Sequence, residues 1–436
     1  MKTSPFKIAV VGLWHLGEIY SAGLAELGHS VVGISDDKKV VADLSRNIPP
    51  LPEPRLEELI VKYQTLATLR YATDFSEAAS CNTLWLTLDT PVNDEDESNL
   101  APIWDALNKS LPHLRDGVLI AVSSQLPVGT SEKIISFVRN QKPKLNFGYV
   151  YTPENLRLGE AVKCFLEPSR IVAGVSSEAA SNAIQEIFSP LKTEIIRMSP
   201  ASAEMAKHAL NAFLATSVSF INDIADACEK SGADVLDVAR ALRSDSRVGP
   251  RAFLDAGLGF SGGTLGRDLV ALMQFSKERG FAVPVIEAAF RKNRGRANDT
   301  VQKISRALGN LHGKTIAIFG LTYKPGTRTL RRSRALEIAA ELEALGATLR
   351  LHDPAVQEEE LPSLPRTSFH RDPYEAARGT NALIFATPWP EFKKLDLKKL
   401  LASTERNAIL WDTANLFYDE RTAITELGIT YIGTGL

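Results

Sequence analysis

One short pattern occurs twice in the chain: an apolar run that ends in glycine and is followed by a loop. The first copy is KIAVVGLWHLG, residues 7–17, and the second is KTIAIFGLTYKPGT, residues 314–327. A later pair, TLWLTLDTP (83–91) and ALIFATPWP (382–390), follows in the same order. Short apolar runs that end in glycine are typical of buried parallel strands. The repeat therefore predicts two related α/β domains.

The segments around these runs extend the prediction. Further strand-like runs at 30–34, 118–122 and 171–174 alternate with helical patterns, as in a doubly wound sheet. Residues 203–230 contain no glycine or proline and keep a wide apolar stripe, which predicts one long helix. A helical stretch continues to about residue 308. We expect two α/β domains joined by a long central helix.

Composition excludes several classes of protein. The 436 residues carry a net charge of −2, with basic residues spread along the chain, so no nucleic-acid surface is expected. Cys81, Cys164 and Cys228 are too far apart for a disulfide framework or a zinc site. No segment reaches the roughly 20 apolar residues of a membrane span. We expect a cytoplasmic protein with no metal and no membrane partner.

The first glycine loop has features of a dinucleotide site. Gly12 and Gly17, in GLWHLG, stand where a Rossmann fingerprint belongs, with Leu16 before the last glycine and Trp14 in place of the middle one. Asp36 lies near the end of the second strand and could accept the ribose hydroxyls, which favours NAD over NADP. Thr90 completes the predicted NAD-binding set. The alternative is a strand, turn and helix that bind no ligand.

Ordered motifs identify a family. The segments TPENLRLGEAVKCFLEPSRIVAG (152–174), AEMAKHALNAF (203–213), GLGFSGGTLGRD (257–268) and GLTYKPGTRTLRRS (320–333) resemble the UDP-glucose/GDP-mannose dehydrogenase family. LHDP (351–354), PWPEF (388–392) and WDTAN (411–415) extend the resemblance over nearly the whole chain. It implies an NAD-binding Rossmann-like domain at 1–200, a helical dimerisation domain at 201–308 and a nucleotide-sugar-binding Rossmann-like domain at 309–436. Members oxidise the sugar's primary alcohol to a carboxylate through a cysteine thioester, consuming NAD twice.

The resemblance assigns roles to individual residues. Lys207, Asn211, Glu154 and Asp268 match catalytic positions, and the i, i+4 spacing of Lys207 and Asn211 puts both on one helical face. An ammonium and an amide there could stabilise a developing oxyanion. The positions that match substrate contacts are Arg247, Gly257, Gly259, Phe260, Lys324 and Arg331. Without the family match, each would be interpreted as an ordinary surface, loop or helix residue.

Three positions depart from the family around one reaction centre. Thr264 aligns with the nucleophilic cysteine, Gln125 with a threonine that orders the catalytic water, and Leu158 with a second glutamate. The segment after KPGT is also changed, because Arg328 and Thr329 replace acidic residues and Arg332 and Arg334 follow. The loss of a thiolate removes the strongest nucleophile available near neutral pH.

Three functions remain open from the sequence. The first is an NAD-dependent oxidoreductase that acts on the primary alcohol of a UDP- or GDP-linked sugar without the thioester route. The second is an epimerase that uses NAD transiently. The third is a non-catalytic relative that binds a nucleotide sugar. For all three we expect a nucleotide-sugar ligand and a homodimer built on the 203–230 helix.

Overall fold

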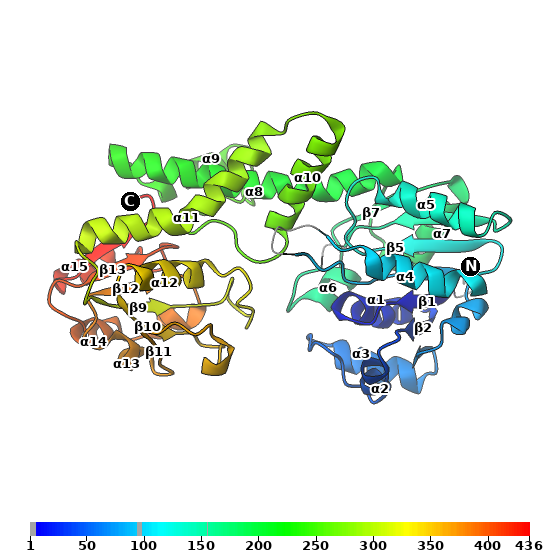
Figure 1. The fold of residues 1–436 in the computed structure, drawn as a ribbon, viewed down its shortest axis with the longest axis horizontal. Coiled ribbons are helices and arrows are strands. Elements are labelled where there is room, and N and C mark those ends of the chain that lie inside the picture. The colour runs from blue at the N-terminus through cyan, green and yellow to red at the C-terminus, as the bar shows by residue number, and fades with distance from the viewer. Residues whose placement is uncertain (1–5, 94–97, 155) are drawn as a thin grey trace. The chain divides into compact units, whose positions relative to one another are not determined.

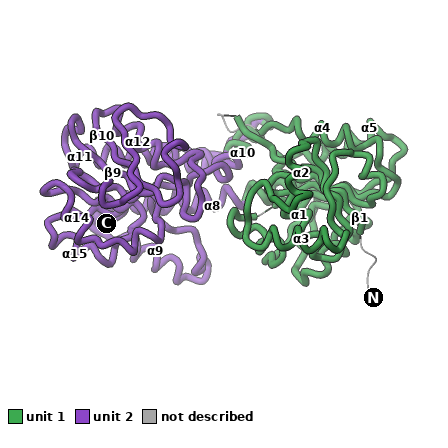
Figure 2. The backbone as a smooth tube through the Cα atoms, turned by 90° about the horizontal axis from the view of Figure 1, so that it is seen from below, with its two compact units in different colours: residues 1–209, 270–279 green, residues 210–269, 280–436 purple. Residues whose placement is uncertain are grey.

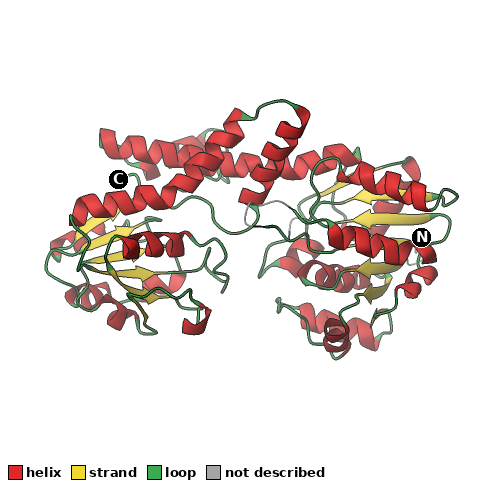
Figure 3. Cartoon of the chain, viewed as in Figure 1, coloured by secondary structure: helices red, strands yellow, loops and turns green. Residues whose placement is uncertain are grey.

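The computed structural model describes residues 6–93, 98–154 and 156–436. The chain forms two compact units, which Figure 2 shows in separate colours. Unit 1 comprises Met1–Ala209 with Val270–Arg279, and unit 2 comprises Leu210–Leu269 with Gly280–Leu436. Each unit contains its own sheet with helices packed on it (Figure 3).

The sheet of unit 1 has the strand order β3-β2-β1-β4-β5-β6-β7-β8 (Figure 1). Pairing is parallel from β3 through to β6, while β7 runs antiparallel to β6. Its strands are β1 (Lys7–Val11), β2 (Ser30–Ile34), β3 (Leu69–Ala72), β4 (Thr83–Leu86), β5 (Val118–Val122), β6 (Phe147–Tyr151), β7 (Ile171–Val175) and β8 (Ile195–Met198). Its helices are α1 (His15–Glu26), α2 (Lys38–Ser45), α3 (Leu56–Thr65), α4 (Ala101–Ser110), α5 (Thr130–Gln141), α6 (Ala161–Leu166) and α7 (Glu178–Ile187).

Strand β1 shows why these apolar runs are buried. Successive side chains point to opposite faces of a strand. Ile8 and Val10 accordingly join one apolar cluster, and Ala9 and Val11 join another. A run without polar alternation is therefore required where helices cover both faces of the sheet.

The sheet of unit 2 repeats the arrangement, with the order β11-β10-β9-β12-β13-β14 and parallel pairing throughout. Its strands are β9 (Thr315–Phe319), β10 (Thr348–His352), β11 (Thr367–Phe369), β12 (Ala382–Phe385), β13 (Ile409–Asp412) and β14 (Thr430–Gly433). Its helices are α12 (Arg334–Ala344), α13 (Pro373–Ala377), α14 (Leu397–Ala402) and α15 (Arg421–Glu426). The predicted α/β repeat is confirmed.

The long helix predicted at 203–230 is also confirmed. It is α8 (Pro200–Ser231), 32 residues long, and it contributes to both units. After it come α9 (Val235–Ser244), α10 (Leu265–Arg279) and α11 (Pro284–Leu308) (Figure 1). Within the described residues, none of the helices has the length and apolar character needed to cross a membrane.

Candidate active site

The turn from β1 into α1 is closely packed at both predicted glycines. Gly12 has φ of 96°, and a Cβ there would lie 2.8 Å from Leu88 Cγ. A Cβ on Gly17 would lie 1.6 Å from the Gly12 carbonyl oxygen. Both positions therefore require glycine. The turn leaves the N-terminus of α1 directly after Trp14, where free backbone N–H groups favour a pyrophosphate.

The other predicted cofactor residues surround this turn. The Trp14 side chain is 49% exposed, and Leu16 is buried. Asp36 accepts a hydrogen bond from Lys109 Nζ at 2.7 Å, which lowers the pKa of the Asp36 carboxyl and keeps it ionised. Its side chain is largely exposed and can still accept from ribose hydroxyls. Thr90 donates to the Gln125 carbonyl at 3.0 Å. Apart from the Trp14 indole, the geometry suits NAD.

Lys207 and Glu154 are brought together within unit 1. The Lys207 side chain is 6% exposed, and its Nζ donates to the Glu154 carbonyl oxygen at 2.6 Å. The Glu154 carboxylate lies 3.8 Å from the same Nζ and accepts from the Leu156 amide through its second oxygen. A buried ammonium held next to a carboxylate is an arrangement suited to proton transfer or charge stabilisation.

The loop that carries Gln125 is fixed by two residues that the sequence did not single out. Glu204 accepts from the amides of Gly129 and Ser131, both at 2.6 Å. His208 makes a 2.9 Å hydrogen bond to the Leu126 carbonyl. Both residues lie on α8 beside Lys207 in sequence. The helix that carries Lys207, the predicted catalytic lysine, thus also orders the loop that carries Gln125.

Asn211 and Asp268 form a second buried pair, within unit 2. The Asn211 amide donates to the Asp268 carboxylate, and both side chains are buried. Thr264 is exposed and directly precedes α10, and its carbonyl accepts from the Asp268 amide at 3.2 Å. A thiolate at such a helix N-terminus would be stabilised by the helix dipole. A threonine hydroxyl there is a common helix N-cap but a weak nucleophile.

The glycine loop that precedes Thr264 packs tightly against the rest of unit 2. A Cβ on Gly257 would lie 2.9 Å from the Thr413 carbonyl oxygen, in the WDTAN segment. Gly259 has φ of 85°, and a Cβ on Gly262 would lie 2.9 Å from the ring of Tyr323. Phe260 is buried. The predicted substrate loop therefore contacts two other family motifs.

The C-terminal motifs meet at the loop after β9. Asp353, in LHDP, accepts from the amides of Leu321 and Thr322 at 2.6 and 3.2 Å. Thr387 donates to the Thr322 carbonyl at 2.5 Å, and Trp389 donates to its hydroxyl at 3.1 Å. Segments that are distant in sequence thus fix the start of the loop after β9, residues 320–333, which we call the basic loop.

The predicted phosphate-binding residues lie on this loop. Lys324 is half-buried, with Nζ 5.7 Å from the centre of the Tyr323 ring, and Arg331 is exposed. Two of the additional arginines have acidic neighbours, since Arg328 pairs with Glu360 at 3.0 Å and Arg334 pairs with Glu337. The assignment of Lys324 and Arg331 as phosphate contacts stays a prediction.

Two further positions named from the sequence are Arg247 and Leu158. The Arg247 side chain is 87% exposed, and its hydrogen bonds go to Asp245, two residues before it. Its assignment as a substrate contact stays a prediction. Leu158 is half-buried in the segment after Glu154.

The structure also locates the cysteines. Cys228 is buried in an apolar cluster of the helical region, and Cys81 is buried in unit 1. Cys164 lies on the wall of a small cavity of about 70 Å³ that Tyr20, Glu154 and Arg170 also line. Cys164 therefore lies near the Glu154 segment.

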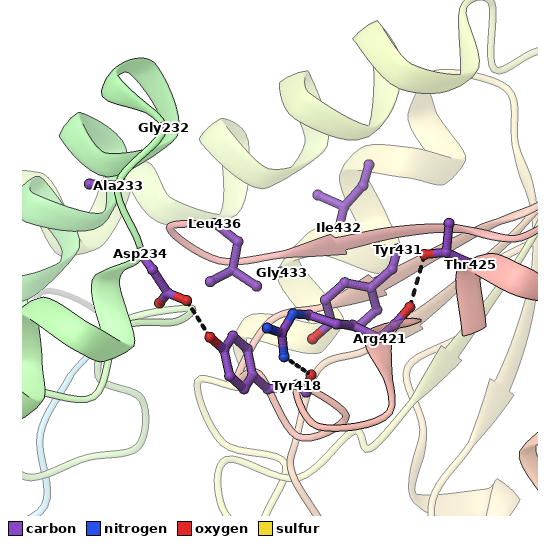
Figure 4. Close-up of a pocket in the computed structure, with 10 residues that line it drawn as sticks. All are labelled: Gly232, Ala233, Asp234, Tyr418, Arg421, Thr425, Tyr431, Ile432, Gly433 and Leu436. Atoms are coloured by element: carbon purple, nitrogen blue, oxygen red, sulfur yellow. Dashed lines mark hydrogen bonds between the residues drawn. The ribbon is translucent and has the colours of Figure 1, made fainter. Parts of the chain in front are cut away.

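A larger pocket of about 530 Å³ lies elsewhere in unit 2. Figure 4 shows hydrogen bonds among the residues that line it: Tyr418 donates to the Asp234 carboxylate, Arg421 donates to the Tyr418 carbonyl at 2.6 Å, and Thr425 donates to the Arg421 carbonyl at 2.8 Å. None of the predicted site residues lines this pocket. It does not contribute to the functional assignment.

One wholly parallel and one mostly parallel sheet, with the strand order of dinucleotide-binding folds, together with a glycine turn suited to NAD, are typical of a Rossmann-type oxidoreductase. Residues 6–192, 201–295 and 317–419 match the NAD binding, central and UDP binding domains of the UDP-glucose/GDP-mannose dehydrogenase family. The chain belongs to this family. It is an NAD-dependent enzyme whose C-terminal domain is of the UDP-binding type.

Individual relatives cover nearly all of the chain. The UDP-glucose 6-dehydrogenase TuaD of Bacillus subtilis is 35% identical over 94% of this chain and 89% of its own length. The UDP-glucose 6-dehydrogenase of Rhizobium meliloti is 32% identical over 98% of this chain and 99% of its own. A UDP-glucose dehydrogenase structure from Pyrobaculum islandicum aligns with a TM-score of 0.88 at 28% identity, covering 100% of this chain and 98% of that one.

Proposed function

We propose that this protein oxidises the primary alcohol of a UDP- or GDP-linked sugar with NAD, without the cysteine thioester route. One observation carries the proposal. Thr264, which aligns with the family's cysteine, directly precedes α10, while the Lys207–Glu154 and Asn211–Asp268 pairs are retained, with Lys207, Asn211 and Asp268 buried. The names of the relatives, UDP-glucose 6-dehydrogenases, support the substrate class.

The chemistry that these residues support is a single two-electron step. When bound, NAD would accept the hydride from the carbinol carbon, and the Gly12–Gly17 turn with Asp36 would hold it.

 The hydroxyl proton of the carbinol would pass to solvent or to the Glu154 carboxylate beside the Lys207 ammonium. The Lys207 ammonium and the Asn211 amide would stabilise the negative charge that develops on the oxygen. The product is an aldehyde. A second oxidation would proceed through its hydrate, because a threonine hydroxyl would need a strong base to act as the nucleophile.

The stoichiometry of NADH tests the proposal. Purified protein is mixed with limiting UDP-glucose or GDP-mannose and excess NAD, and the absorbance of NADH is followed to completion. We expect a single equivalent of NADH per sugar and an aldehyde that a hydrazine reagent traps. Two equivalents would indicate the ordinary family reaction, and none would leave the epimerase or the binding protein. The Lys207→Met variant is the control, because it should form no NADH while still binding the nucleotide.

The identity of the sugar is best found by binding. A panel of UDP- and GDP-linked sugars, with and without NAD, is compared by thermal unfolding. A ligand at 100 times its dissociation constant adds about 2.7 kcal/mol to the free energy of unfolding, which is readily detected. The ligand that gives the largest shift is then used for the NADH measurement.

We also propose that the 201–308 region is a dimerisation domain built on α8. Phe213 is 69% exposed and Phe220 is 46% exposed on this helix. They are seven residues apart, about two turns, and therefore share one face. Exposed aromatic side chains that share one face of a helix are unusual on a monomer surface. Light scattering at micromolar concentration should give a dimer mass, and Phe213→Ser with Phe220→Ser should give a monomer. A monomer mass for the wild type would contradict the proposal.

A further inference from the structure

Buried polar side chains on α8 and α11 form hydrogen bonds with the backbone of the glycine loop that precedes Thr264. On α11, Asn293 is 4% exposed. Its Oδ1 accepts from the Phe260 amide at 2.7 Å, and its Nδ2 donates to the Phe260 carbonyl at 3.0 Å. One side chain therefore satisfies both backbone groups of a loop residue, in the way that a neighbouring strand would.

Gly257 is held in a similar way at the start of the loop. Its amide donates to Asn222 Oδ1, on α8, at 3.0 Å. Its carbonyl accepts from Arg296, on α11, through Nε at 3.2 Å and Nη2 at 2.9 Å. Arg296 is 2% exposed. We call Asn222, Asn293 and Arg296 the loop clamp.

The charge of Arg296 is balanced by Asp226. Arg296 Nη1 lies 3.0 Å from Asp226 Oδ1, and Lys292 and Lys303 also pair with this carboxylate, at 2.5 and 3.1 Å. Burial opposes the ionisation of Asp226, but Lys292, Arg296 and Lys303 lower its pKa to about 2. The guanidinium therefore keeps its partner at every pH at which an enzyme would work.

Steric contacts limit the loop further. Gly259 has φ of 85°, and a Cβ there would lie 2.2 Å from Asn293 Oδ1. A Cβ on Gly257 would lie 2.9 Å from the Thr413 carbonyl oxygen. The clamp can approach so closely only because these residues are glycines.

We propose that Asn293 and Arg296 are positioning residues, which set the backbone of residues 257–260 in the form that binds the nucleotide sugar. The inference rests on the proposed function. Ordering a loop before its ligand arrives removes that ordering cost from binding. The clamp therefore acts on the affinity for the sugar nucleotide more than on hydride transfer, and it leaves the affinity for NAD unchanged.

The test compares Asn293→Ala and Arg296→Lys with the control Lys303→Met. Arg296→Lys keeps a charge beside Asp226 but cannot make the double contact with Gly257. Lys303→Met removes a charge from the same ion-pair network on the same helix, and the hydrogen bonds of Lys303 go to Asp226 and Glu229 rather than to the loop. UDP-glucose and GDP-mannose are the probes, and NAD affinity is measured in parallel.

We expect both clamp variants to raise the dissociation constant and KM for the nucleotide sugar by roughly 10- to 100-fold, about 1.4 to 2.8 kcal/mol. NAD affinity should stay within about twofold, and kcat should fall less than KM rises. The control should keep the wild-type affinity for the sugar. Equal effects in the clamp variants and the control, or equal losses of NAD and sugar affinity, would overturn the proposal.

Hydrogen exchange of the ligand-free protein gives a second readout. The Phe260 amide should lose protection in Asn293→Ala and keep it in Lys303→Met. If the wild type binds neither probe, the proposed function fails, and the exchange measurement still decides whether the clamp orders the loop. Unchanged protection in Asn293→Ala would overturn the positioning role by itself.

Discussion

Strands β1 to β6 of unit 1 and the six strands of unit 2 lie in the same order, but the chain leaves β1 and β9 differently. In unit 1, β1 is followed by Gly12 and α1 begins at His15. In unit 2, β9 is followed by Gly320, but α12 begins only at Arg334. Both glycines have positive φ, and each lacks a Cβ that would collide with the segment after the fourth strand in sheet order: Leu88 in unit 1 and Thr387 in unit 2.

This comparison separates what the fold requires from what the ligand requires. The glycine after the first strand is required by packing in both units. The short turn of unit 1 exposes a helix N-terminus for a pyrophosphate. The longer loop of unit 2 brings side-chain cations instead, among them Lys324 and Arg331. The two units can therefore bind two different nucleotides on the same architecture.

The largest expected effect comes from Gly17, which has no counterpart in the longer loop. Gly17→Ala would place a Cβ 1.6 Å from the Gly12 carbonyl oxygen, a backbone atom that cannot rotate away. We expect loss of NAD binding and a loss of at least about 3 kcal/mol in the free energy of unfolding. Calorimetry and NAD titration measure both.

Gly28→Ala is the matched control for Gly17→Ala. Gly28 has φ of 92° and nothing within 4 Å of the added Cβ, so only the backbone strain of about 1 kcal/mol should appear. Wild-type NAD affinity in Gly17→Ala would show that the turn does not bind the cofactor.

The second effect concerns Glu18, a buried carboxyl in the first turn of α1. In the described part of the chain its oxygens lack a hydrogen-bond partner of good geometry. Burial raises its pKa to about 8; the Leu51 backbone offsets this in part, and Glu53 adds to it. The folded state therefore favours the protonated carboxyl, and this contribution is complete below the unfolded pKa and is lost as pH rises through about 8.

Glu18→Gln should remove that pH dependence. We expect the variant to gain on the order of 3 kcal/mol over the wild type at pH 8 and little at pH 5, measured by denaturant unfolding. The exposed Glu391→Gln should change stability by less than about 0.5 kcal/mol. A stability difference that does not grow with pH would contradict a neutral Glu18.

The third effect tests the basic loop of unit 2. Lys324→Ala and Arg331→Ala should each weaken UDP binding by roughly tenfold and leave NAD affinity unchanged, since a charged hydrogen bond is worth about 1.5–3 kcal/mol. Arg378→Ala is the control, because this exposed arginine, which directly follows α13, pairs with Glu375. Parallel losses of UDP and NAD affinity would contradict the division of ligands between the two units.

The smallest effect concerns Trp14. Its side chain is half exposed, so the turn accommodates the indole without burying it. Trp14→Gly should still tighten NAD binding by a few fold, about 0.5 to 1 kcal/mol, because glycine allows the closest backbone approach to a pyrophosphate. Unchanged NAD binding in a calorimetric titration would show that the indole does not hinder the cofactor, and weaker binding would show that it contributes to the site.

Much of the fold could be predicted because it follows from local patterns. The apolar run at 7–12 and the stripe at 203–230 correspond to β1 and α8 within a few residues. Long-range polar pairs leave no such signal. Asn293 contacts Phe260 33 residues away, and Glu53 accepts from the Gly159 amide 106 residues away. The loop clamp could not be found from periodicity, since a buried asparagine in a helix looks like any polar helix residue.

The site was predictable to the extent that motifs carry it. The sequence placed Lys207 and Asn211 one turn apart on a helix, but their partners, Glu154 and Asp268, come from segments that only the fold brings near. The antiparallel direction of β7 was not predictable either, because the direction of a strand depends on the connection before it rather than on its own residues.

The central claim is that Thr264 stands in place of the family's nucleophile while the Lys207–Glu154 and Asn211–Asp268 pairs are retained. Intact-mass spectrometry of wild type and Thr264→Cys, each incubated with NAD and UDP-glucose or GDP-mannose, tests it most directly. We predict no adduct on the wild type and a sugar-nucleotide adduct on Thr264→Cys. That adduct should accumulate, because Gln125 and Leu158 leave its hydrolysis about 100- to 10,000-fold slower. Adding Gln125→Thr and Leu158→Glu should release the acid. An adduct on the wild type, or none on Thr264→Cys, would contradict the claim.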